Sequence, residues 1–197
     1  MWTIDKQFGF CYGHRVWTQQ LIKEYCEQGD VSCKCKHLHG HEAAVHVFLE
    51  SSTLTRGMVT DFKHLGWLKE FIDTYLDHKF IMDVNDPLFQ TVVKPSLLLN
   101  KDIVCLDELP LKEVRLPFSL YTFGYIVDQS KLRSDIAPEM LEYLLGFFFV
   151  TFVPTSEHLS EFLYLLVCEK MKAFSEITVR KVEWFETPKS RSSYISE

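Results

Sequence analysis

The chain has 197 residues, enough for one domain with a sizeable core, and 47% of them are hydrophobic while 24% are charged. This balance is typical of a folded globular protein and excludes a disordered chain. The net charge of −6 and the scattered basic residues argue against a nucleic-acid-binding protein, because the short run Lys34-Cys35-Lys36 is too small for a phosphate-binding stripe.

No segment of the sequence is typical of a targeting signal or a membrane span. The first ten residues mix acidic, basic and polar side chains where a signal peptide needs an apolar run. The most apolar stretch, 144–153, has about half of the roughly 20 residues that cross a bilayer. We therefore expect a cytoplasmic protein that does not contact membranes. In that compartment the six cysteines are expected to be metal ligands, catalytic thiols or core residues rather than disulfides.

Apolar and polar residues alternate in two segments of the first fifty residues, which predicts half-buried strands. The first strand is expected at 2–12, with His14 continuing its apolar side just beyond the end, and the second at 41–50. Between them, 18–38 is polar and rich in cysteine, and we expect a loop that contains at most a short helix at 18–27. Further strands are expected at 147–153 and 177–186, followed by a polar tail.

Two helices are predicted from apolar residues at helical spacing. One begins at Thr60 or Asp61 and ends near Leu76, and the other spans 155–173. The apolar stripes expected to face the core are Phe62, Leu65, Leu68, Ile72 and Tyr75 in the first helix, and Leu159, Phe162, Leu163, Leu166 and Met171 in the second.

The segment between these elements, 88–146, is interrupted by Pro95, Pro110 and Pro117, and a short helix is expected from Ser134-Asp135 to Leu145. Its apolar runs, such as Leu97 to Leu99, should pack against the rest of the domain rather than extend into solvent. The order of strands and helices indicates a single α+β domain built on an antiparallel sheet.

Residues 33–47 carry the densest chemical signal. His39 and His41 lie two apart at the start of a strand, so both imidazoles project from one face, and Gly40 between them permits a close approach by another group. Two such histidines are half of a zinc site, and a third ligand would complete a catalytic centre with an open position. His14 is the best candidate for that ligand.

Other interpretations of this segment stay open on spacing alone. A His-x-His pair on a strand often serves packing or the surface. Cys33 and Cys35 also permit a structural zinc site of two cysteines and two histidines.

Six segments in order resemble the signature segments of the 6-pyruvoyltetrahydropterin synthase / 6-carboxytetrahydropterin synthase family. They are FGFCYGHRV at 8–16, CKHLHGH at 35–41, MVTDF at 58–62, LDHKFIMD at 76–83, PTSEHL at 154–159 and VEWFETP at 182–188. The resemblance covers roughly 1–87 and 147–195 and implies the tunnelling fold (T-fold), with two helices packed on one face of the sheet and 88–146 as an insertion atypical of the family.

The resemblance also implies the site residues and the cofactor Zn²⁺. The zinc ligands would be His14, His39 and His41, and the proton-transfer residues would be Cys35, Asp77 and His78. The pterin-binding residues would be Glu186, Glu157 and Thr155.

These roles are chemically coherent. Zinc acidifies protons beside the hydroxyls that it binds, and Cys35 as a thiolate, with its pKa lowered by zinc or cationic groups, would abstract one of them. Asp77 would orient His78 for a second proton transfer, and the Glu186 carboxylate would accept two parallel hydrogen bonds from the pterin. Cys33 rivals Cys35, because Cys33-x5-His39 matches the spacing of the animal pyruvoyl-type enzymes.

The resemblance implies the conversion of 7,8-dihydroneopterin triphosphate to 6-carboxytetrahydropterin with loss of acetaldehyde and triphosphate. The alternatives are the pyruvoyl-type reaction, which eliminates triphosphate without carbon–carbon cleavage, and a non-catalytic module stabilised by zinc. It also implies a homo-oligomer, for example a hexamer. One departure from the family is the sequence Cys11-Tyr12-Gly13 before His14, where small residues such as Ala are usual.

Overall fold

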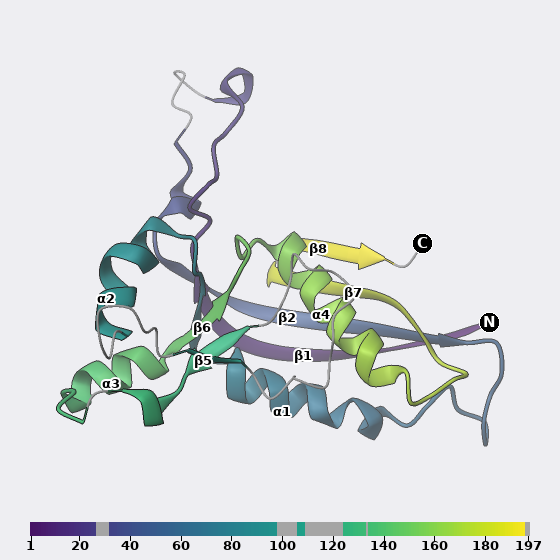
Figure 1. Cartoon of the computed structure of the whole chain (residues 1–197). Coiled ribbons are helices and arrows are strands. Elements are labelled where there is room, and N and C mark those ends of the chain that lie inside the picture. The colour runs from purple at the N-terminus through teal and green to yellow at the C-terminus, as the bar shows by residue number, and fades with distance from the viewer. Residues whose placement is uncertain (27–31, 98–105, 109–123, 133, 196–197) are drawn as a thin grey trace.

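A computed structural model describes residues 1–26, 32–97, 106–108, 124–132 and 134–195. Its centre is one sheet of eight strands in the order β4-β5-β6-β3-β1-β2-β7-β8 (Figure 1). The strands are β1 (Trp2–His14), β2 (His39–Ser51), β3 (Lys79–Asp83), β4 (Leu106–Glu108), β5 (Tyr125–Val127), β6 (Phe147–Val150), β7 (Thr178–Thr187) and β8 (Ser190–Ile195).

The strands β1 and β2 are the longest of the sheet and pair in antiparallel orientation. Its register runs from Trp2 opposite Ser51 to His14 opposite His39, without interruption. Alternate β1 residues face the core because side chains of a strand point to opposite faces in turn: Phe8, Phe10 and Tyr12 are each at most 5% exposed. The predicted inward parity of the first strand is confirmed, and it carries His14 into the protein interior.

Two long helices cover one face of this sheet, as predicted (Figure 1). The first, α1 (Gly66–Tyr75), follows a 3₁₀ turn, η4 (Phe62–Leu65), whose N-cap Asp61 accepts a hydrogen bond from the Lys63 N–H at 2.8 Å. The second, α4 (Ser156–Met171), buries the whole predicted stripe of Leu159, Phe162, Leu163, Leu166 and Met171.

The predicted stripe of the first helix is partly wrong. Leu65, Leu68 and Ile72 are buried, whereas Phe62 is 46% exposed and Tyr75 is only partly buried. The difference follows from the tighter 3₁₀ turn at the start, which rotates Phe62 out of the face that a continuous α-helix would give it.

The described part of the insertion packs into a second apolar cluster, as expected. Its helical elements are η5 (Phe89–Val93), α2 (Lys94–Leu97), η6 (Gln129–Lys131) and α3 (Pro138–Leu145). The cluster comprises Met82, Phe89, Val93, Leu97, Val127, Leu144, Phe147 and Phe149. Leu97 is fully buried, while Leu98, Leu99, Pro110 and Pro117 lie outside the described residues.

The strands β3, β4, β5 and β8 were not predicted from the sequence. β3 was not predicted, and it pairs in parallel with both β1 and β6, so only part of the sheet is antiparallel. Its sequence does not alternate because both of its faces are covered: Ile81 joins the core under the helices and Met82 the second cluster. The expected polar tail contains a further strand, since Ser190–Ile195 forms β8 against β7.

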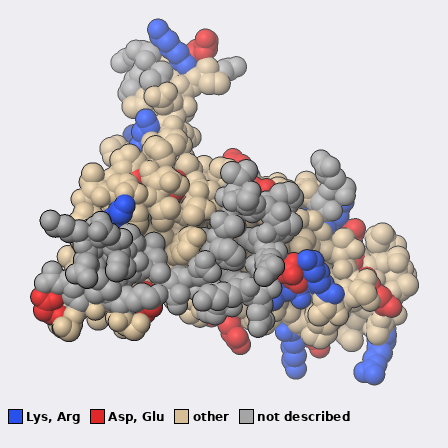
Figure 2. All heavy atoms as spheres, viewed as in Figure 1, with Lys and Arg blue, Asp and Glu red and all other residues tan. Residues whose placement is uncertain are grey.

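The loop after β1 projects from the body of the molecule (Figure 1). In place of the short helix considered for 18–27, its described residues form the 3₁₀ turn η1 (Lys23–Tyr25), and a second turn, η3 (Lys34–Lys36), leads into β2. No helix among the described residues is long and apolar enough to cross a membrane. Among the described residues on the face seen in Figure 2, basic and acidic side chains are interspersed.

Candidate metal centre and surrounding site

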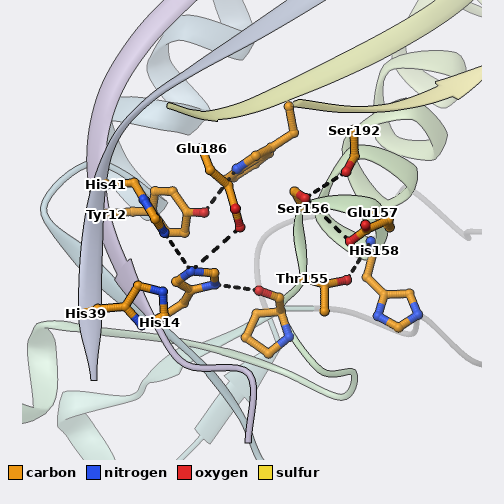
Figure 3. A network of polar contacts seen from close by, with 12 residues as sticks. Tyr12, His14, His39, His41, Thr155, Ser156, Glu157, His158, Glu186 and Ser192 are labelled. Carbon is orange, nitrogen blue, oxygen red and sulfur yellow. Dashed lines mark hydrogen bonds and ion pairs between the residues drawn. The ribbon is translucent and has the colours of Figure 1, made fainter. Parts of the chain in front are cut away.

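Three histidines converge where β1 ends and β2 begins. Because His14 lies opposite His39 in the β1–β2 register and Tyr12 opposite His41, the predicted ligands share one face of the hairpin. One ligand atom from each of His14, His39 and His41 lies within 4.8 Å of the others. Figure 3 shows the three rings gathered around one point, as the sequence analysis expected.

Backbone carbonyls orient two of the imidazoles. The Nδ1 atom of His14 lies 2.6 Å from the Pro154 carbonyl oxygen, and that of His39 lies 2.8 Å from the His37 carbonyl oxygen. Each Nδ1 therefore carries the proton and donates it, which leaves Nε2 with a lone pair for a metal. The Nε2 atoms of His14 and His41 face each other at 3.1 Å.

The protonation of these rings suits metal binding. Burial lowers the pKa of His14 from 6.5 to about 4, with the nearby His39 and His41 adding to the shift. Burial also lowers the pKa of His41, and His39 again contributes. Neutral imidazoles are the form that binds metal ions, so the donor set fits a divalent cation such as zinc.

This shift predicts an acid-sensitive metal-free protein. His14 stays neutral in the fold, whereas in the unfolded chain it takes up a proton near pH 6.5. The free energy of unfolding should therefore fall as pH drops from about 6.5 to about 4, by about 3 kcal/mol from His14 alone. Urea unfolding of chelator-treated protein at several pH values measures this loss. His14→Gln should flatten the dependence, and parallel curves for the two proteins would contradict the assignment.

Gly40 allows the two ligand-bearing strands to come close. A Cβ at this position would lie 2.9 Å from the Tyr12 carbonyl oxygen, and that backbone atom cannot move without parting β1 from β2. Gly40→Ala should weaken zinc binding about tenfold or more, because displaced supporting groups misalign the ligands. Competition with a chromophoric chelator measures the affinity. Gly66→Ala is the matched control, since a Cβ there meets nothing within 4 Å.

Glu186, at the end of β7, lies beside the histidines as predicted. Its Oε1 is 3.7 Å from His14 Nε2, and its side chain is 25% exposed. Burial raises the pKa of Glu186, and the charge of Glu157 raises it further. A carboxylate in this position can accept hydrogen bonds from a ligand that is held next to the metal.

Tyr12 and Trp184 form the inner wall of this site. The Trp184 indole N–H donates to the Tyr12 hydroxyl at 3.2 Å, and the two rings meet edge to face with centroids 5.2 Å apart. Burial, together with the charge of Glu186, raises the pKa of Tyr12. The Tyr12 ring also lies 5.0 Å from the His14 ring, centroid to centroid, so this departure from the family pattern shapes the metal centre directly.

The other two predicted pterin-binding residues lie at the start of α4, beside Glu186 (Figure 3). Thr155 is the N-cap, and its hydroxyl accepts from the His158 N–H at 3.3 Å. Glu157 is in the first turn, where an acidic side chain is stabilised by the helix dipole. Thr155 thus caps α4, and the charge of Glu157 raises the pKa of nearby Glu186.

Asp77 and His78 form the predicted pair, with Asp77 Oδ2 3.0 Å from His78 Nδ1. Cys11 of β1 holds both: its N–H donates to Asp77 Oδ1 at 2.8 Å, and its carbonyl accepts from the His78 N–H at 2.7 Å. The first of these bonds, together with His78, lowers the pKa of Asp77. His78 has a φ of 57°, a strained backbone for a non-glycine residue, and its side chain is 80% exposed.

A cavity of about 870 Å³ lies next to His78, on the side of β1 and β2 to which Cys11 and Glu42 point. His39, His41 and His78 all line it, although His14 and Glu186 do not. Its other walls are mainly apolar and include Phe80, Leu88, Val92, Tyr143 and Phe147. The described part of the insertion therefore covers one side of this cavity.

Cys35 lies in η3, the turn that precedes β2, and Cys33 is the N-cap of that turn. Both side chains are half-buried. Neither forms a disulfide, and the same holds for exposed Cys11 and for half-buried Cys26 and Cys168; Cys105 lies outside the described residues. Burial and the adjacent Cys33 raise the pKa of Cys35. The chain's own groups thus oppose the lowering that the sequence analysis expected, which leaves that effect to a bound metal ion.

A group of buried polar contacts next to the metal ligand His14 was not predicted from the sequence. Arg15 and Trp17, which follow His14, contact Asp86 and Asp83 at the end of β3. The two aspartates are 1% and 3% exposed, and acidic residues are rarely buried unless they are paired. Their place directly after a buried strand was the available signal.

Comparisons with known proteins agree over the full chain. A model of the family described as 6-pyruvoyl tetrahydropterin synthase matches residues 3–197. The 6-carboxy-5,6,7,8-tetrahydropterin synthase of Aquifex aeolicus is 31% identical over 205 residues, which cover 100% of this chain and 99% of that protein. The crystal structure of an uncharacterized protein from Wolinella succinogenes is 40% identical and superposes with a TM-score of 0.85, over 100% of this chain and 98% of that one.

Proposed function

Because this chain belongs to the 6-pyruvoyl tetrahydropterin synthase family, we propose that it is a zinc-dependent 6-carboxy-5,6,7,8-tetrahydropterin synthase. Membership makes it a pterin-processing lyase, and its α+β architecture is the tunnelling fold. The proposed substrate is 7,8-dihydroneopterin triphosphate, and the proposed products are 6-carboxytetrahydropterin, acetaldehyde and triphosphate. The full-length similarity to the Aquifex aeolicus enzyme supports the carboxy-type reaction.

The observation that carries the proposal is the three-histidine cluster beside Glu186. The cluster offers three nitrogen ligands, and in catalytic zinc sites three protein ligands leave a fourth position for substrate. A zinc ion bound there would supply Lewis acidity toward the hydroxyls of the substrate side chain. Glu186 supports pterin binding, since its carboxylate can accept from the ring N–H and the amino group together.

The remaining roles are assigned to the chain's own proton-transfer groups. Cys35 would abstract a proton from a side-chain carbon of the substrate. His78, with Nδ1 held by Asp77, would present Nε2 to carry a proton on the other side of the substrate.

The pyruvoyl-type reaction is the second candidate. The position of Cys33 favours it, because this thiol has the spacing of the animal enzymes and contacts Cys35 within the same turn. Incubation of the zinc-loaded protein with dihydroneopterin triphosphate, followed by product identification, separates the two. Acetaldehyde release supports the carboxy-type reaction, and its absence with all side-chain carbons retained would establish the pyruvoyl type. No turnover with zinc bound would leave the non-catalytic module.

We also propose a homo-oligomer, for example a hexamer, in the cytoplasm. The 80% exposure of the His78 side chain supports an interface, since a proton-transfer residue works best when shielded from bulk water. Sedimentation equilibrium of the zinc-loaded protein tests the assembly, and a monomer at micromolar concentration would contradict it.

A further inference from the structure

Two buried carboxylates at the end of β3 hold the loop that follows the metal ligand His14. Asp86 Oδ2 lies 2.9 Å from Arg15 Nε, and Asp83 Oδ2 accepts from the Trp17 indole N–H at 3.0 Å. Both carboxylates are almost fully buried, at 1% and 3% exposed. Neither contact belongs to the sheet or to the metal cluster.

The second oxygen of each carboxylate is fixed by its own turn. Asp83 Oδ1 accepts from the backbone N–H of Asn85 at 2.8 Å and from its side chain at 2.9 Å. Asp86 Oδ1 accepts from the Leu88 N–H at 2.7 Å. Each aspartate is thus rigidly placed and presents only its outer oxygen to the loop after β1.

The residue between Arg15 and Trp17 reaches the proposed catalytic thiol. The Val16 N–H donates to the Cys35 carbonyl at 2.8 Å, and the Val16 side chain is buried. Residues 15–17 therefore link three parts of the structure. They follow His14 directly in the chain, they bind the Cys35 carbonyl through a backbone hydrogen bond, and they contact two buried aspartates at and after the end of β3.

We propose that Asp83 and Asp86 are positioning residues that place Cys35 relative to the metal centre through Arg15, Val16 and Trp17. The inference rests on the proposed function, in which Cys35 abstracts the proton. Asp86 also starts the helical segment of the insertion, because its carbonyl accepts from the Gln90 N–H at 3.2 Å. The start of the insertion thus supports the catalytic turn, in addition to covering the cavity.

The contacts predict effects on rate rather than on substrate binding. Asp83 and Asp86 do not line the cavity and make no contact with Glu186 in the described structure, so substrate affinity should be preserved. A thiol displaced by a fraction of an ångström loses its alignment with the proton that it abstracts, and a misplacement of about 1 Å costs on the order of a hundredfold in rate.

The test uses Asp86→Asn, which keeps the shape of the side chain and removes its charge, and Trp17→Phe, which removes one N–H donor. We expect kcat to fall about tenfold to a hundredfold while KM changes less than about twofold and zinc content is unchanged. Iodoacetamide should alkylate Cys35 about threefold faster or more, because the released turn exposes the thiol. Exposed Cys11 is the internal reference and should react at an unchanged rate.

Two further variants separate positioning from general stability. Arg15→Lys keeps a cation for Asp86 and should retain most of the activity, whereas Arg15→Met should behave like Asp86→Asn. Asp128→Asn is the matched control, because this residue makes the same kind of turn in the insertion and accepts from the Ser130 N–H at 2.9 Å.

A lower melting temperature with unchanged kcat and unchanged Cys35 alkylation would overturn the proposal. If Asp86→Asn does not fold, Trp17→Phe decides on the same measurements. The alkylation rates need no substrate, so they test the positioning of Cys35 even if the wild-type protein converts no pterin. A wild-type protein that converts no pterin would refute the proposed function, whereas the alkylation rates would still show whether Asp83 and Asp86 position Cys35.

Discussion

Replacement of His14 by Ala is expected to remove bound zinc and to lower pterin turnover by roughly a thousandfold or more. The loss of a ligand deprives the substrate of several kcal/mol of Lewis-acid stabilisation, and each 1.4 kcal/mol is about tenfold in rate. The loss of activity should be larger than the loss from removing a buried side chain that binds no metal. His14 is 1% exposed, but its Nε2 also lies 3.1 Å from His41 Nε2, at the proposed metal position. Metal analysis by mass spectrometry and steady-state kinetics measure the two losses.

His46→Ala is the matched control for this experiment. His46 lies on the same strand as His39 and His41 but on the opposite face, where it pairs with Asp5 at 3.9 Å and packs on Phe185. Its removal should leave zinc content and turnover unchanged. A His14→Ala protein that keeps one zinc ion per chain would show that the metal does not need His14, and the three-histidine site would be rejected.

Replacement of Cys35 by Ala is expected to lower turnover by roughly a hundredfold to ten-thousandfold, the range of a lost general base, with zinc fully retained. The retained metal is the informative part, because it separates a proton-transfer group from a ligand. Cys35 lies in η3, outside the three-histidine cluster, so its removal leaves all three nitrogen ligands in place. Turnover and metal content should be measured on the same preparation.

Cys33→Ala is the natural comparison because the two thiols share one turn and the same degree of exposure. If Cys35 is the base, the Cys33 variant keeps most of its activity, and its Cys35 thiol becomes more acidic because a group that raises the pKa is gone. The reverse pattern, with Cys33→Ala inactive and Cys35→Ala active, would transfer the catalytic role to Cys33 and favour the pyruvoyl-type reaction.

The described part of the insertion lines one side of the cavity next to His78. Val92 and Tyr143, from two separate parts of the insertion, line the same cavity as His39, His41 and His78. A family member without these residues would leave that side of the cavity to solvent or to another subunit. The insertion therefore helps to shape this cavity.

Local pattern in the sequence determined much of this protein. The alternation over 2–12 and 41–50 predicted β1 and β2 and their inward faces, because a strand exposes alternate residues to the core. The same period of two placed His39 and His41 on one face, and helical spacing predicted the buried stripe of α4. These features depend on neighbours in the chain, which the sequence displays directly.

Tertiary structure alone decided which distant residues meet. His14 joins the pair on β2 because the β1–β2 register sets it opposite His39, and Glu186 arrives beside it from β7. β3 was not predicted because both of its faces are buried. For the same reason the contacts of Asp86 and Asp83 with the loop after His14 were not predicted. Such contacts depend on the pairing of strands far apart in the chain, so their residues carry no local period, and only the folded sheet brings them to the metal centre.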